Sequence, residues 1–94
     1  MYTPIKKQIT AAGYVAVTLP TGHSCSSYSL WTEDGAAFYV AGADDSSGTN
    51  GVLVTTDGTN GFALTINEVR GAGATICYAK GTSTTNLVGL ITKD

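Results

Sequence analysis

Apolar and polar residues alternate along most of this chain, with the two-residue period of a half-buried β-strand. The alternation is clearest over residues 14–19, where Val15, Val17 and Leu19 share one side of the predicted strand. Elsewhere, short runs also predict β-strands, because they are rich in Val, Ile, Thr and Tyr and are bounded by turn-forming residues. The pattern predicts strands over residues 5–10, 14–19, 25–32, 37–41, 52–56, 62–66, 75–80 and 87–92.

Turns rich in glycine separate the predicted strands. Asp34 and Gly35 follow the third of them, and an Asp-Gly pair favours the positive φ angles of a tight hairpin turn. We therefore predict that the two strands flanking this turn pair with each other antiparallel. The polar residues 42–51 predict a loop, and residues 67–73 predict a connection between strands.

These elements predict an all-β fold, a small antiparallel β-sandwich or jelly-roll-like barrel of seven to eight strands with essentially no helix. The 12 glycines spread along the chain would break most helices. Jelly-roll-like and immunoglobulin-like topologies both fit the pattern. Residues 1–12 are predicted as an N-terminal arm or edge strand, and residues 13–94 as a single β-sandwich domain. The predicted core comprises Val17, Phe62, Leu64, Ile66, Ile76 and Tyr78.

The length and the charge of the chain limit the number of domains and the kinds of partner that we expect. A chain of 94 residues is long enough for one domain only. The formal net charge is −2, and the five basic residues are scattered, so the charge pattern lacks the basic patch of a nucleic-acid-binding protein. The apolar runs are too short for a transmembrane helix. We expect neither a nucleic-acid partner nor membrane association.

The residues that usually carry catalysis are few. His23 is the only histidine and lies next to Ser24 in a predicted turn, an arrangement that does not make a catalytic triad. Cys25 and Cys77 are the only cysteines, and without a Cys/His cluster they do not predict a zinc site. They are either two buried free thiols or one disulfide, and free thiols are favoured because no secretion signal is visible.

Oxygen-rich side chains gather in the loop over residues 42–51. Asp44, Asp45 and Asn50, with Asp57 in the next turn, are of the type that Ca²⁺ prefers, but their spacing does not match a helix-loop-helix calcium site. A solvated loop held by Asx turns is the favoured interpretation. We expect no enzymatic activity, no catalytic residue, no metal and no cofactor.

Trp31 and Tyr39 flank the predicted Asp-Gly hairpin and could share an outer face. Such an aromatic pair can pack within the chain, contact another protein or stack on a sugar ring, and the sequence leaves all three open. Together with the N-terminal segment they form the candidate interface, which comprises Tyr2, Ile5, Lys6, Lys7, Trp31 and Tyr39.

The order of strand and turn segments resembles that of small virion proteins of tailed bacteriophages. The matching stretches are Val15-Ala16-Val17-Thr18-Leu19-Pro20, Phe38-Tyr39-Val40-Ala41-Gly42, Asn50-Gly51-Val52-Leu53, Ile76-Cys77-Tyr78-Ala79, Gly81-Thr82 and Leu87-Val88-Gly89-Leu90. They span nearly the whole chain but consist of strand and turn residues, not of chemical groups. One departure is Ala41, where the pattern more often has glycine.

The resemblance implies a structural protein of the virion, either a capsid decoration (cement) protein or a head–tail accessory protein of β-sandwich type. We expect a decoration protein that binds the outer shell of a bacteriophage capsid and stabilises it, assembled into the virion in the cytoplasm of the bacterial host. The expected partners are the major capsid protein or neighbouring virion proteins and further copies of the chain, in a trimer. The segment from Tyr2 to Ile9 would contact the shell or a neighbour. A tail, neck or baseplate accessory protein and a carbohydrate- or receptor-binding module are the alternatives.

Overall fold

The computed structural model describes residues 2–55 and 64–92, with only the backbone described for Tyr2 and Leu64. Within these ranges the chain forms strands and contains no helix, so none could span a membrane. The all-β prediction is confirmed. The strands are β1 (Tyr2–Ile9), β2 (Val15–Thr18), β3 (Cys25–Thr32), β4 (Phe38–Ala41), β5 (Val52–Val54), β6 (Leu64–Arg70), β7 (Thr75–Gly81) and β8 (Thr85–Thr92).

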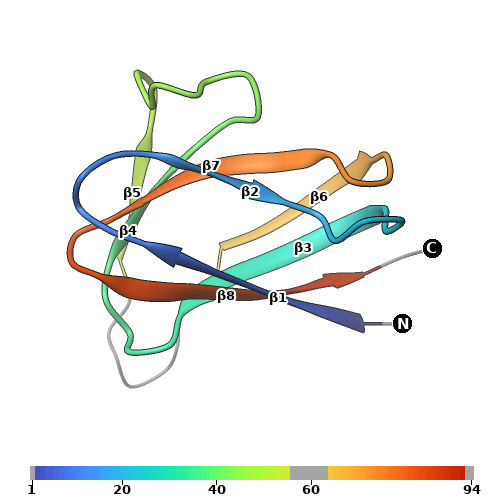
Figure 1. Cartoon of the computed structure of the whole chain (residues 1–94), viewed down its shortest axis with the longest axis horizontal. Coiled ribbons are helices and arrows are strands. Elements are labelled where there is room, and N and C mark those ends of the chain that lie inside the picture. Colours follow the sequence, from blue (N-terminus) through green and yellow to red (C-terminus); the bar gives the residue numbers. More distant parts are fainter. Residues whose placement is uncertain (1, 56–63, 93–94) are drawn as a thin grey trace.

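The strands form two four-stranded antiparallel sheets that pack face to face (Figure 1). Their orders are β1-β8-β3-β6 and β2-β7-β4-β5, so that β1 and β2, β3 and β4, β5 and β6, and β7 and β8 lie in opposite sheets. This arrangement of eight strands is a jelly roll. The structure therefore selects the jelly roll over the immunoglobulin-like alternative, and makes β1, β2, β5 and β6 the edge strands.

The predicted hairpin around Asp34 and Gly35 is wrong, because β3 pairs with β6 and β8 while β4 pairs with β5 and β7. Gly35 does adopt a positive φ of 77°, but the turn carries the chain from one sheet to the other. The Asp34 carboxylate accepts hydrogen bonds from the Ala36 amide at 3.1 Å and from the Thr85 hydroxyl at 2.7 Å, which ties the crossover to β8. Local turn residues thus set the direction of the bend, and long-range pairing sets the partner strands.

The core lies between the two sheets and draws on both of them. Among the described residues, its largest fully buried side chains are Phe38, Ile9, Leu30, Ile76, Leu87, Ile91 and Cys77. The predictions for Val17 and Ile76 are confirmed, and Ile66 is partly buried against the same cluster. Phe62 and the side chain of Leu64 lie outside the described residues.

Tyr78, which was predicted to lie in the core, is only half buried. The cause is a bulge where β7 pairs with β2, because the register passes from Cys77 to Thr75 and leaves Ile76 without a partner. Both Ile76 and Cys77 are buried at this bulge. The extra residue reverses the expected alternation, so that Ala79 turns inward and Tyr78 outward.

Strand β6 continues through residues that the sequence predicted as a connection. It extends to Arg70 and pairs with β3, although Asn67, Glu68 and Arg70 are polar or charged. Its side chains alternate between more exposed and half-buried positions from Thr65 onward. A polar strand of this kind suits the edge of a sheet, where one side meets solvent.

Candidate interaction surfaces

The predicted interface residues Lys6 and Trp31 lie on one surface, the outer face of the β1-β8-β3 sheet. Lys6 pairs with Val88 on β8, and Trp31 pairs with the same residue from the other side. The three side chains therefore form a row across the sheet, which we call the outer row. Trp31 is half buried, whereas its neighbours Leu30 and Thr32 are buried on the inner face.

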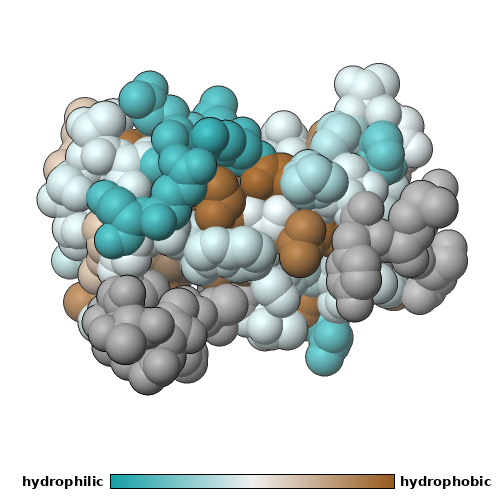
Figure 2. Space-filling view, turned by 90° about the horizontal axis from the view of Figure 1, so that it is seen from below, coloured by the Kyte–Doolittle hydropathy of each residue, from teal (hydrophilic) through white to brown (hydrophobic). Residues whose placement is uncertain are grey.

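Charged and apolar groups adjoin on this surface. The Lys6 ammonium lies 3.0 Å from the Glu33 carboxylate, whose second oxygen accepts a hydrogen bond from the Asn86 amide at 2.9 Å. The hydrogen bond from Asn86 and, to a smaller extent, the one from Lys6 hold the pKa of Glu33 below its ordinary value. Leu90, 37% exposed, lies two residues beyond Val88 on β8. Figure 2 shows hydrophobic atoms in the middle of the face that carries β1 and β8, with a hydrophilic group to one side.

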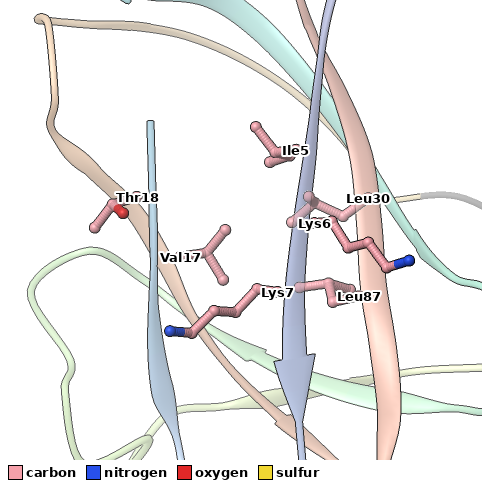
Figure 3. Close-up of a pocket in the computed structure, with 7 residues that line it drawn as sticks. All are labelled: Ile5, Lys6, Lys7, Val17, Thr18, Leu30 and Leu87. Atoms are coloured by element: carbon pink, nitrogen blue, oxygen red, sulfur yellow. The ribbon is translucent and has the colours of Figure 1, made fainter. Parts of the chain in front are cut away.

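Ile5 and Lys7 lie at the narrow side of the sandwich, where β1 faces β2. They line a cavity of about 70 Å³ together with Lys6, Val17, Thr18, Leu30 and Leu87. Figure 3 shows the Lys7 amine extending toward β2 while the Lys6 amine points the other way. For Tyr2 the structure describes the backbone only. Of the candidate interface, the structure thus groups Lys6 with Trp31 across Val88 on the outer face, and Lys6 with Ile5 and Lys7 around this cavity.

Tyr39 lies on the opposite outer surface, in the β2-β7-β4-β5 sheet. It pairs with Lys80 on β7 and Leu53 on β5. The Lys80 ammonium lies 4.9 Å from the centre of the Tyr39 ring and 5.5 Å from that of Tyr14, a pair of cation–π contacts. Because Trp31 and Tyr39 point away from each other, they do not form a common platform for one sugar ring.

The loop over residues 42–51 is packed under Tyr14. Gly48 adopts a φ of 72°, and a Cβ atom at Gly48 or at Gly51 would collide with the Tyr14 ring. The tyrosine ring therefore fixes the loop against the outer surface of the sheet.

The Asp45 carboxylate organises the same loop from within. It accepts hydrogen bonds from the Asn50 amide at 2.8 Å and the Thr49 amide at 3.0 Å. These donors, the Asn50 amide first, lower the pKa of Asp45. Its oxygens thus serve as an internal cap, in line with the Asx interpretation. Asp57 lies outside the described residues, and within them no three His, Cys, Asp or Glu side chains gather as metal ligands would.

The remaining chemical candidates are separated from one another. His23 places its Nδ1 atom 3.3 Å from the carbonyl oxygen of Thr21 in its own turn. Cys25 and Cys77 are both buried and free. Burial raises the pKa of the Cys77 thiol to about 12, and burial also raises that of Cys25. Protonated, covered thiols are poor nucleophiles.

Sequence reasoning missed a cleft at the other side of the sandwich, where β5 faces β6. It has a volume of about 380 Å³ and apolar walls that include Val40, Val52, Val54 and Ile66. Val52 is 65% exposed, although it lies on the same face of β5 as Val54, which is 7% exposed. An inward-facing valine is thus left uncovered. The continuous apolar run Val52-Leu53-Val54 was the only sequence signal for it.

An ion pair lines the same cleft. Arg70 and Glu68, both on β6, approach to 2.7 Å. The Nε atom of Arg70 is buried, and among the described residues it has no hydrogen-bond partner. At the floor of the cleft the Tyr28 hydroxyl donates to the Ile76 carbonyl at 3.3 Å, which links the two sheets.

Comparisons with known proteins do not assign this chain to a family. No protein-family model, no curated protein and no solved structure matches this chain. Function must therefore be inferred from the surfaces themselves.

Proposed function

We propose that this protein is a non-enzymatic structural component of a bacteriophage virion, a decoration (cement) protein that binds the outer shell of the capsid and stabilises it. The outer row Lys6–Val88–Trp31 carries the proposal, because it offers an aromatic anchor beside apolar and charged groups on a rigid sheet. Tryptophan is enriched at the energetically dominant positions of protein interfaces. The jelly roll occurs among viral capsid domains and also among lectins, so it supports the class without deciding it.

The proposed contact uses the face of the sheet and not its β1 edge. Pro4 lacks the amide hydrogen that strand addition needs, and Lys6 and Lys7 follow it on the same strand. Lys6 at the rim and Trp31 nearer the centre follow the usual layout of an interface, with charge outside and aromatic area inside. A capsid repeats the same binding surface many times, so modest contacts at each copy would add up to firm attachment if the copies are joined.

The proposed partners are the major capsid protein or neighbouring virion proteins, together with further copies of this chain. A tail, neck or baseplate accessory protein would use the same outer row. A carbohydrate- or receptor-binding module is less well supported, since Trp31 and Tyr39 lie on opposite surfaces.

The test removes the protein from intact particles and measures their stability. Particles stripped of the protein, or made without its gene, should assemble but rupture at lower temperature or in low salt, and adding the purified protein back should restore them. Trp31→Ala and Lys6→Glu should impair rebinding, whereas Leu53→Ala, an exposed change on the opposite surface, should not. Unchanged shells with defective adsorption or tail joining would instead support the accessory or receptor-binding alternative.

A further inference from the structure

We infer that two copies of this chain pair through the open side of the sandwich, with β6 of one copy running antiparallel to β6 of the other about a twofold axis at Val69. This inference concerns a different surface from the outer row and stands whether or not the shell is the partner. It rests on the edge strands, on the charges of β6 and on the uncovered cleft.

The four edge strands differ in how well they resist pairing. β1 carries a proline and two lysines, the residues that commonly protect an edge. β2 has four residues and β5 only three. β6 has seven residues with neither proline nor lysine, and its Val69 is 81% exposed. Among the edge strands of the described residues, β6 is thus the long strand that is open to strand addition.

The charges on β6 are self-complementary. A single inward-pointing charge on an edge strand would repel a second copy, but Glu68 and Arg70 have opposite signs and flank Val69. In antiparallel pairing centred on Val69, Glu68 of each copy lies opposite Arg70 of the other, an arrangement that stabilises cross-strand pairs. The second copy's carboxylate would also supply an acceptor near the Arg70 Nε atom, which is buried without a partner among the described residues.

The same symmetry accounts for the uncovered cleft. The twofold axis that relates the two β6 strands passes between them and crosses the joined sheet. Because β5 is the edge of the second sheet on the same side of the sandwich, the axis also passes between the β5 strands of the two copies. The cleft of each copy, which is bounded by β5 and β6, would then face that of the other. Val52 and Ile66 would lose water on association, and this burial would support a domain whose own core is small.

The first experiment measures self-association by sedimentation velocity over a range of protein concentrations. The wild-type protein should dimerise. Glu68→Arg and Arg70→Glu should each weaken the dimer about tenfold or more, because each converts two attractive cross-strand pairs into repulsive ones. An equimolar mixture of these two variants, and the double variant with both changes, should recover the dimer. Lys6→Glu, a charge change on the outer row, should leave it intact.

A second experiment tests the position of the axis. Val69→Cys should cross-link the two copies under mild oxidation, since Cα atoms opposite each other in an antiparallel pair are about 4.5–5.5 Å apart, within disulfide range. Val88→Cys, on the outer row, should not cross-link. A wild-type protein that stays monomeric, a trimer, or a dimer unaffected by the charge exchange would overturn the inference. None of these results bears on rebinding to shells through Trp31, so failure of the dimer and failure of the proposed function can be told apart.

Discussion

The two sides of the sandwich, where β1 faces β2 and where β5 faces β6, differ in how well the edge strands cover the core. On the closed side, β1 and β2 are joined by a short turn with a bridge between Thr10 and Gly13, and only about 70 Å³ remains between them. On the open side, β5 and β6 leave a cleft of about 380 Å³. β1 has eight residues and seals its side with Ile5 and Ile9, whereas β5 has three and leaves Val52 uncovered. Inward-facing apolar residues are therefore covered on the closed side, as at Ile9, and one of them, Val52, stays exposed on the open side.

The largest expected effect is on the closed side. Ile9→Ala removes a side chain with no exposed area and should lower the free energy of unfolding by ~2–5 kcal/mol, since truncation leaves a cavity in the core. Urea denaturation monitored by Trp31 fluorescence measures the change. A loss below ~0.5 kcal/mol, typical of surface substitutions, would mean that the closed side is not sealed as described.

Gly89→Ala should come next. Gly89 lies on β8 between Ile5 and Leu30, and a Cβ there would meet the Ser29 carbonyl oxygen and the Leu30 side chain. Overpacking of this kind should cost ~1–3 kcal/mol. Gly42→Ala provides the matched control near the open cleft, because a Cβ there meets no atom within 4 Å. Equal losses in the two variants, measured by thermal unfolding, would contradict the difference between the sides.

Acid should weaken the crossover that joins the two sheets. The hydrogen bond from Thr85, and then the one from the Ala36 amide, lower the pKa of Asp34 below its ordinary value of 3.8. The stability that this carboxylate contributes is therefore fully present above pH 3.8 and is lost as pH falls through the lower folded-state pKa.

Urea denaturation at a series of pH values checks this expectation. Asp34→Asn should make the dependence shallower below pH 3.8, because the group no longer titrates. The Asp45→Asn variant tests the loop beside the open cleft in the same way, because the pKa of the Asp45 carboxylate is also lowered. If the Asp34→Asn profile superposes on that of the wild-type protein, the role given to the carboxylate is wrong.

The smallest effect is expected at Val52. In dilute solution Val52→Ala should change the free energy of unfolding by less than ~0.5 kcal/mol, because the side chain is already 65% exposed. At concentrations where the chain dimerises, the same variant should unfold more easily than the wild-type protein, because it buries less apolar area on association. A large loss at every concentration would show that the cleft is already covered within one copy.

The sequence by itself determined the fold class and the approximate positions of the strands. Alternation is local, so Val15 and Val17 or the run from Cys25 to Thr32 could be read without knowing their partners. Free, buried cysteines at positions 25 and 77 also agree with the favoured interpretation. Turn residues such as Gly35 correctly marked where the chain changes direction.

Only the tertiary structure decided which strands meet and which surfaces result. β1 and β3 both pair with β8, which is distant in sequence, and these two pairings place Lys6 and Trp31 on either side of Val88. Tyr39, only eight positions from Trp31, lies on the other outer surface because the intervening turn crosses between sheets. The bulge at Ile76 and the open edge of β6 likewise depend on partners distant in sequence. Pairing between distant strands is set by the packing of the whole sandwich, and no local pattern of residues encodes it.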